Sequence, residues 1–157
     1  DPVPAGKPEP VEPDKSNVDT SKKLHCTISI DCATILNNLA DLDPAKLDVL
    51  PTDGVILNAV TVEFSEGESV FDVLQRVCRE NNIHIEATFT PGYNSAYVEG
   101  IHNLYEFDCG ELSGWMYSVN GWFPNYGCSR YALQDGDVIR WRYTCDLGAD
   151  VGGSMVA

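Results

Sequence analysis

Residues 69–82, SVFDVLQRVCRENN, are the segment that most directly decides the fold of this 157-residue chain. Ser69 stands where an N-cap is needed, and Asp72, three residues later, completes a weak capping-box pattern. The apolar side chains then recur at helical spacing on one face: Val70, Leu74, Val77 and Cys78, with Phe71 beside them. Asn81 and Asn82 end the pattern, so we expect one amphipathic helix here.

Strand patterns flank this helix on both sides. Before it, LHCTISIDC (24–32) alternates strictly, a short helix is expected over Ala33–Ala40, and VILNAVTVEF (55–64) is rich in β-branched residues. After it, strand signals lie at Ile83–Thr90, Ala96–Ile101, Leu104–Cys109, Trp115–Val119 and Val138–Thr144. This order predicts an α+β domain in which one mixed sheet has the helix packed across one face.

Residues 1–23 differ in composition from the rest of the chain. They contain five of the nine prolines, no aromatic residue and no apolar period. We therefore expect a flexible, Pro-rich and acidic spacer, which buries too little surface to fold. Such a segment is typical of what remains after an export signal is removed, or of a stalk, with an ordinary linker as the alternative. The folded domain is then expected over residues 24–153, with a tail at 154–157.

The chain is strongly acidic, with a formal net charge of −14. The expected domain, residues 24–157 with its tail, holds most of this charge, as 19 acidic and 6 basic residues. Charge of this sign disfavours binding to nucleic acid and to anionic lipid, because both require a basic surface. No apolar run approaches the ~20 residues that span a bilayer, so we expect no direct membrane insertion. We also expect a monomer.

Six cysteines in a small acidic chain are typical of disulfide-bonded proteins from an oxidising compartment. They are Cys26, Cys32, Cys78, Cys109, Cys128 and Cys145. Cys26 and Cys32 lie on one expected strand roughly 20 Å apart, too far for a disulfide, whose Cα atoms approach within about 7 Å. We favour Cys109–Cys128 and a bond from the first strand to Cys145, with other connectivities left open. The alternatives are buried free thiols or zinc ligands, and zinc is disfavoured because no C-x-x-C pair occurs.

The C-terminal part of the chain gathers the aromatic residues, with eight of the 15 between positions 115 and 143. On two expected strands they alternate, as Trp115 with Tyr117 and as Trp141 with Tyr143. Such alternating sets are most simply explained as core. Asn120-Gly121 predicts a tight turn, which places Trp122, Phe123 and Tyr126 in a surface connection. There they either present a binding site or pack beneath the loop.

At these residues the sequence resembles a known family. The runs CGELSGWMYSVNG (109–121) and WFPNYGCSRYALQDGDVIRWRYTCDLG (122–148) resemble an uncharacterised bacterial domain family related to the C-terminal domain of transcobalamin and intrinsic factor. The upstream blocks SIDCATIL (29–36) and EGESVFDVLQRVCRENNIHIE (66–86) are similar to members from Gram-positive gut bacteria. The resemblance covers roughly residues 24 to 153 and omits only the spacer.

The resemblance implies a β-grasp (ubiquitin-like) domain that is exported or attached to the cell surface. In the vertebrate relatives this domain closes over one side of a bound cobalamin, so cobalamin or a related corrinoid is the implied ligand. The matching strand and loop run from Trp115 to Tyr126. Independently, Arg130, Arg140 and Arg142 concentrate positive charge beside this loop, which would suit a ligand that carries a phosphate or carboxylate.

We therefore expect an exported, non-enzymatic ligand-binding module with no intrinsic cofactor. The candidate ligand-binding residues are Trp115, Tyr117, Asn120, Trp122, Phe123, Tyr126 and Arg130. The alternative is a surface display or adhesion module that recognises a protein or a glycan through the same aromatic loop. An enzyme is disfavoured because no nucleophile–base pair can be named, and calcium is disfavoured because the acidic residues match no EF-hand loop.

Overall fold

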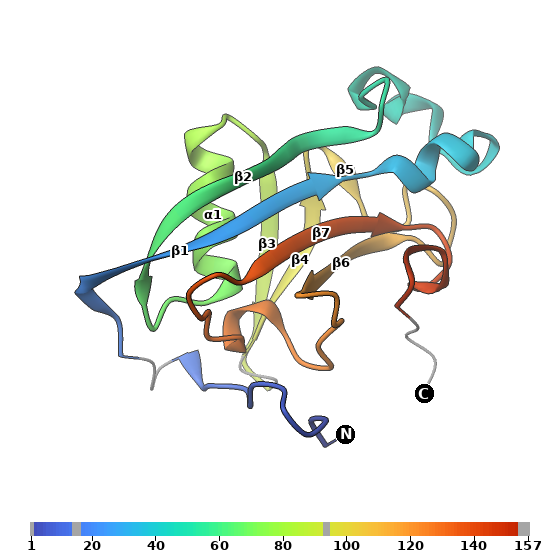
Figure 1. Ribbon diagram of the computed structural model, residues 1–157. Helices are drawn as coiled ribbons and strands as arrows, with labels where there is room; N and C mark the ends of the chain where they lie inside the picture. Colours follow the sequence, from blue (N-terminus) through green and yellow to red (C-terminus); the bar gives the residue numbers. More distant parts are fainter. Residues whose placement is uncertain (1, 14–16, 93–94, 154–157) are drawn as a thin grey trace.

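The computed structural model describes residues 2–13, 17–92 and 95–153 (Figure 1). The expected tail at 154–157 lies outside the described residues. The strands are β1 (Asp19–Asp31), β2 (Val55–Glu66), β3 (Ile85–Thr90), β4 (Ser95–Ile101), β5 (Leu104–Tyr105), β6 (Gly114–Val119) and β7 (Val138–Thr144), and the α-helix is α1 (Val70–Glu80). Short 3₁₀ turns are η2 (Ala33–Asn37), η3 (Leu39–Asp41), η4 (Pro44–Val49), η5 (Cys128–Arg130) and η6 (Ala149–Val151). The α+β class is confirmed.

The larger sheet has four strands in the order β2-β1-β7-β6. Its two central strands, β1 and β7, are parallel, and the outer pairs are antiparallel. The alternation expected for β1 is confirmed, because Ile28 and Ile30 are fully buried on one face. Helix α1 lies across that face of the sheet (Figure 1).

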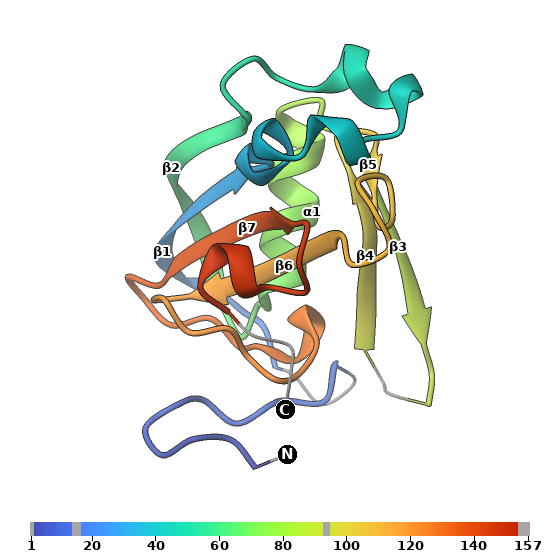
Figure 2. The same ribbon diagram turned by 90° about the vertical axis from the view of Figure 1, so that its right-hand side faces the viewer.

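The remaining strands form a second sheet, in the order β3-β4-β5, so the expectation of one mixed sheet was wrong. β3 and β4 pair with each other in an antiparallel hairpin. In the side view, α1 lies between the larger sheet and this hairpin (Figure 2). Helix α1 therefore has a strand layer on either side of it.

Two expected elements are shorter or tighter than the sequence indicated. The strand expected over Leu104–Cys109 ends at Tyr105, because Phe107 takes a φ of 71° that a strand excludes. The helix expected over Ala33–Ala40 is divided into η2 and η3. The other expected strands are present within a few residues of their predicted bounds.

Helix α1 begins and ends as predicted. The Ser69 side chain accepts a hydrogen bond of 3.1 Å from the Asp72 amide, and the Asp72 carboxylate accepts one of 2.9 Å from the Ser69 amide. This is a complete capping box. The face that packs on the sheet is buried throughout: Val70, Val73, Leu74, Val77 and Cys78.

Part of the expected N-terminal spacer belongs to the folded domain. β1 begins at Asp19, so the last five residues of the expected spacer belong to a strand. Residues 2–13 contain no helix or strand longer than a turn, and they run along one end of the molecule, beneath the loop that joins β6 to β7 (Figures 1 and 2). None of the helices in the described residues is long and apolar enough to cross a bilayer.

The six cysteines are free thiols in the structure, and all but the half-buried Cys145 are buried. Neither favoured disulfide is formed. Cys109 Sγ donates to the Asn38 carbonyl at 3.4 Å, whereas Cys128 Sγ faces the Ala96 carbonyl. Cys109 and Cys128 thus point into different parts of the core.

Candidate functional site

The concave surface of the molecule lies between α1 and the β3–β4 hairpin. Two adjoining hollows open there, of about 260 Å³ and about 400 Å³. Both are lined by Phe71 and Gln75 of α1 and by Phe89 and Ala96 of the hairpin. We call the two together the groove.

The groove is a consequence of two local periodicities. Phe71 and Gln75 are one helical turn apart, so they share the edge of α1 that faces away from the larger sheet. Phe89 and Ala96 are cross-strand partners, so they share the face of the hairpin turned toward α1. Phe89 nevertheless remains 54 % exposed. It offers an aromatic face that the protein itself does not cover.

One basic residue borders the groove. Arg130, at the end of η5, lines the smaller hollow together with Val11 and Pro13. Its Nη2 atom forms an ion pair of 2.9 Å with Glu12. Its Nε atom is buried and has no hydrogen-bond partner in the described part of the chain. Arg130 therefore places a guanidinium group at the edge of the groove, with Nη2 paired to Glu12.

Next to Arg130 the structure gathers an aromatic cluster. Tyr126 stacks on Tyr131 with ring centroids 5.9 Å apart, and Trp122 meets both rings at 6.1 and 6.4 Å. The Tyr117 hydroxyl donates to the Tyr126 carbonyl at 2.7 Å and holds the loop against the core. Burial raises the pKa of Tyr126 to about 12 and moves the pKa of Tyr117 and Tyr131 upward as well. These three hydroxyls are therefore neutral hydrogen-bond donors at neutral pH.

The two predicted strand residues lie in the core. Trp115 is 8 % exposed and its indole Nε1 donates to the Leu104 carbonyl at 2.8 Å. Tyr117 is 9 % exposed and lies against Trp141, with ring centroids 5.4 Å apart. The core interpretation of the alternating aromatic sets is thus the one that the structure supports for these strands.

The other predicted residues lie in the connection after β6. Asn120 and Gly121 form the expected turn with φ values of 53° and 83°. The Asn120 side-chain amide is engaged at both ends, because its nitrogen donates to Asp137 and its oxygen accepts from the Val138 amide, each at 2.9 Å. Phe123 packs its ring against the backbone at Gly153. Asn120 and Phe123 therefore hold the loop in place, while Trp122, Tyr126 and Arg130 lie together at its surface.

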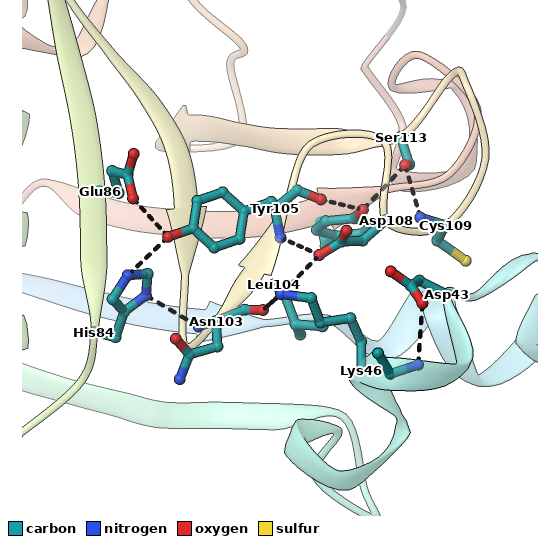
Figure 3. Close-up of polar contacts among 12 residues, drawn as sticks. Asp43, Lys46, His84, Glu86, Asn103, Leu104, Tyr105, Asp108, Cys109 and Ser113 are labelled. Carbon is teal, nitrogen blue, oxygen red and sulfur yellow. Dashed lines mark hydrogen bonds and ion pairs between the residues drawn. The ribbon is translucent and has the colours of Figure 1, made fainter.

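A second polar cluster lies on the β5 side of the molecule (Figure 3). The Tyr105 hydroxyl donates to Glu86 at 2.6 Å and lies 3.0 Å from His84 Nε2. His84 Nδ1 accepts from the Asn103 amide at 3.1 Å, so the ring proton is on Nε2 and points to Tyr105. The hydrogen bond to Glu86 raises the pKa of Tyr105 to about 12.

Lys46 completes this cluster from η4. Its ammonium group donates to the Asn103 carbonyl at 2.7 Å, lies 3.5 Å from Asp108 and stands 4.9 Å from the centre of the Tyr105 ring (Figure 3). None of these residues lines the groove. They fix the β4–β5 turn, in which His102 and Asn103 both have positive φ.

Sequence reasoning missed the groove. Its main residues, Phe71, Gln75 and Phe89, lie on separate elements whose contact depends on how the hairpin meets the helix. One signal was present, since Phe71 flanks the buried stripe of α1 without belonging to it. Among the described residues no group of three or more His, Cys, Asp or Glu side chains is placed to hold a metal ion.

Comparison with known proteins adds the following findings. The family model described as "Domain of unknown function (DUF4430)" matches residues 67–145, half of the chain. No curated protein matches the chain in sequence. The crystal structure of haptocorrin in complex with Cbi is similar with a TM-score of 0.56 and 14 % identity, over 83 % of this chain and 27 % of haptocorrin. This chain thus spans about a quarter of haptocorrin's length, and the likeness is one of fold.

A second solved structure is that of a "putative metal binding protein" from Ruminococcus gnavus ATCC 29149. It covers 77 % of this chain and 96 % of its own, with 14 % identity and a TM-score of 0.44.

Proposed function

The chain belongs to the DUF4430 family, and we propose that it is a non-enzymatic module that binds a small-molecule ligand in the groove. Its recognition as a transcobalamin-like domain of uncharacterised function is confirmed by the family match and by the haptocorrin fold. The observation that carries the proposal is the pair of adjoining hollows with an uncovered aromatic ring, Phe89, between them.

The chemistry of the groove supports a ligand with a broad apolar face. Its walls are mostly apolar, and small-molecule sites are typically apolar hollows of about 300–1,000 Å³ with a few polar groups. The polar residues that line it are Ser69, Asp72, Gln75, Thr88, Ser129 and Arg130. In the described part of the chain, the lining contains no histidine or cysteine that could serve as a catalytic base or nucleophile.

The ligand that we propose is cobalamin or a related corrinoid. The similarity of fold to haptocorrin supports this choice of probe, and so does the sequence resemblance to the cobalamin-facing domain of transcobalamin. A corrin ring presents a wide, largely apolar plane that the rings of Phe71 and Phe89 could face. The groove is open, so it would cover only one side of such a ligand, and we expect a dissociation constant of roughly 10–100 μM.

Equilibrium dialysis against cyanocobalamin, read by the colour of the ligand, tests the proposal. Phe89→Ala should weaken binding about fivefold or more, because the variant removes the aromatic contact. Phe107→Ala is the matched control, since Phe107 is 63 % exposed but lines neither hollow. Absence of binding up to about 100 μM would contradict the proposal, and so would equal effects of the two variants.

We further propose that the module is exported and works outside the cell or at its surface. The even number of cysteines supports this location, and so does the proximity of Cys109 and Cys145, whose thiols influence each other's pKa. The strand order β2-β1-β7-β6, with parallel central strands and α1 across one face, supports a β-grasp topology.

A further inference from the structure

The N-terminal segment, residues 2–13, lies on the aromatic cluster. We call the surface formed by Trp122, Tyr126 and Arg130 the aromatic surface. Pro8, Pro10, Val11, Glu12 and Pro13 are each partly buried, although none of them belongs to the hydrophobic core. The segment therefore gains its contacts from this surface rather than from the interior.

Two hydrogen bonds join the backbone of the segment to the aromatic surface. The Tyr126 hydroxyl donates to the Pro8 carbonyl at 2.7 Å. Three residues later, the Val11 amide donates to the Arg130 carbonyl at 2.8 Å. The segment is thus held at both a carbonyl and an amide, as bound peptides are held by peptide-recognition domains.

Charge and aromatic contacts fix the register of the segment. Glu12 forms the ion pair of 2.9 Å with Arg130. At the other end, the Lys7 ammonium stands 5.6 Å from the centre of the Trp122 ring. Lys7 therefore contacts the Trp122 ring at one end of a six-residue stretch, and Glu12 pairs with Arg130 at the other end.

The sequence of the segment suits this mode of binding. Prolines at positions 8, 10 and 13 fix φ and favour the polyproline II conformation, so little conformational entropy is lost on docking. Proline has no amide hydrogen, which leaves few backbone donors to satisfy. Grooves lined by aromatic rings are a recurrent way to bind such peptides.

We propose that the aromatic surface is a docking site for an extended, proline-rich, acidic peptide, and that residues 2–13 of this chain occupy it. The proposal does not rest on ligand binding in the groove. It assigns Trp122, Tyr126 and Arg130 to peptide recognition. The Tyr126 hydroxyl and the Arg130 carbonyl bind the peptide backbone, and the Arg130 side chain binds the acidic residue.

Amide hydrogen exchange of the full chain, measured by NMR, tests the docking. The Val11 amide should exchange at least tenfold more slowly than in a synthetic peptide of residues 1–13, because its hydrogen bond must open first. Tyr126→Phe and Arg130→Gln should each reduce this protection roughly three- to tenfold, the equivalent of one hydrogen bond or ion pair. Tyr97→Phe and Arg140→Gln are the controls. They remove the same hydroxyl and guanidinium groups from positions that do not contact the segment.

Competition with the free peptide tests recognition as such. A tethered segment has an effective concentration in the millimolar range. The unlabelled peptide of residues 1–13, added at several millimolar, should therefore lower Val11 protection about twofold or more, whereas a scrambled peptide of the same composition should not. The proposal is overturned if Val11 exchanges at the free-peptide rate in the parent chain, if control and test variants act alike, or if the peptide fails to compete.

Discussion

Cys109, in the loop after β5, and Cys145, directly after β7, lie close enough for each thiol to influence the pKa of the other. Cys145 Sγ also lies 3.6 Å from the Thr34 hydroxyl, and Cys109 Sγ bonds to the Asn38 carbonyl. Both thiols therefore face the 3₁₀ turns that follow β1. The two cysteines therefore lie near each other where the end of the larger sheet meets the loop that precedes β6.

Mild oxidation should join this pair first. With oxidised glutathione, the Cys145 thiolate would displace one glutathione, and the Cys109 thiolate would then displace the second to form Cys109–Cys145. Peptide mapping by mass spectrometry should find this linkage, and Cys145→Ser should abolish it. The loop so closed would add about 3–4 kcal/mol to the free energy of unfolding. Recovery of a Cys109–Cys128 linkage instead would contradict the structure.

Alkaline pH should destabilise the protein through its buried cysteine thiols. Burial raises the pKa of Cys26 to about 11 and that of Cys78 to about 12. Their folded-state pKa values lie above the unfolded value of about 8.5, so the stability that they contribute is complete below that pH and is lost as the pH rises toward 12. Urea unfolding under reducing conditions should show a free energy that falls between pH 8.5 and 10. Cys78→Ala should make this slope shallower, and a flat profile in the parent chain would refute the prediction.

Removal of the helix cap should be measurable by thermal unfolding. Ser69→Ala leaves the Asp72 amide without its side-chain partner and should cost about 1 kcal/mol. Ser69→Thr keeps an accepting oxygen and is the matched control. Equal losses in the two variants would mean that the cap contributes nothing to stability and that only the side-chain volume at position 69 matters.

Two glycines with similar backbone conformations should respond differently to alanine. Gly54 and Gly136 have φ values of 74° and 87°, so either substitution is expected to cost about 1–2 kcal/mol in backbone strain. At Gly54 the added Cβ would also stand 2.6 Å from the Ala33 Cα, whereas at Gly136 nothing lies within 4 Å. Gly54→Ala should therefore be the more damaging by a further 1–3 kcal/mol or so. Denaturant midpoints of the two variants compare them directly, and similar values would rule out the predicted close contact at Gly54.

The elements that sequence predicted well are those governed by local periodicity. The cap at Ser69 and the alternation in β1 each depend on residues within one turn or one strand. The division into two sheets could not be predicted, because it depends on which strands pair. The sequence pattern of the β3–β4 hairpin is the same whether or not the hairpin joins a larger sheet.

The candidate site was predicted only in part. Tyr126 and Arg130 lie near each other in the connection that follows the Asn120-Gly121 turn, and their role in ligand binding stays a prediction. Period-two alternation could not show whether Trp115 faces a ligand or the core, because the partner layer that buries it comes from distant sequence. The docking of Pro8 and Val11 was hidden for another reason, since a segment too polar to fold alone can still bind to a surface made elsewhere.

The centre of the larger sheet is built from β1 and β7, strands that lie near opposite ends of the chain. During synthesis, the edge of β1 that pairs with β7 therefore stays unpaired until nearly all of the domain has been made. A domain with such distant pairing at its centre should fold slowly, in milliseconds or longer, and its rate should depend on closing that long loop. When the chain emerges from its N-terminus, the central strand pair therefore cannot form before β7 has emerged.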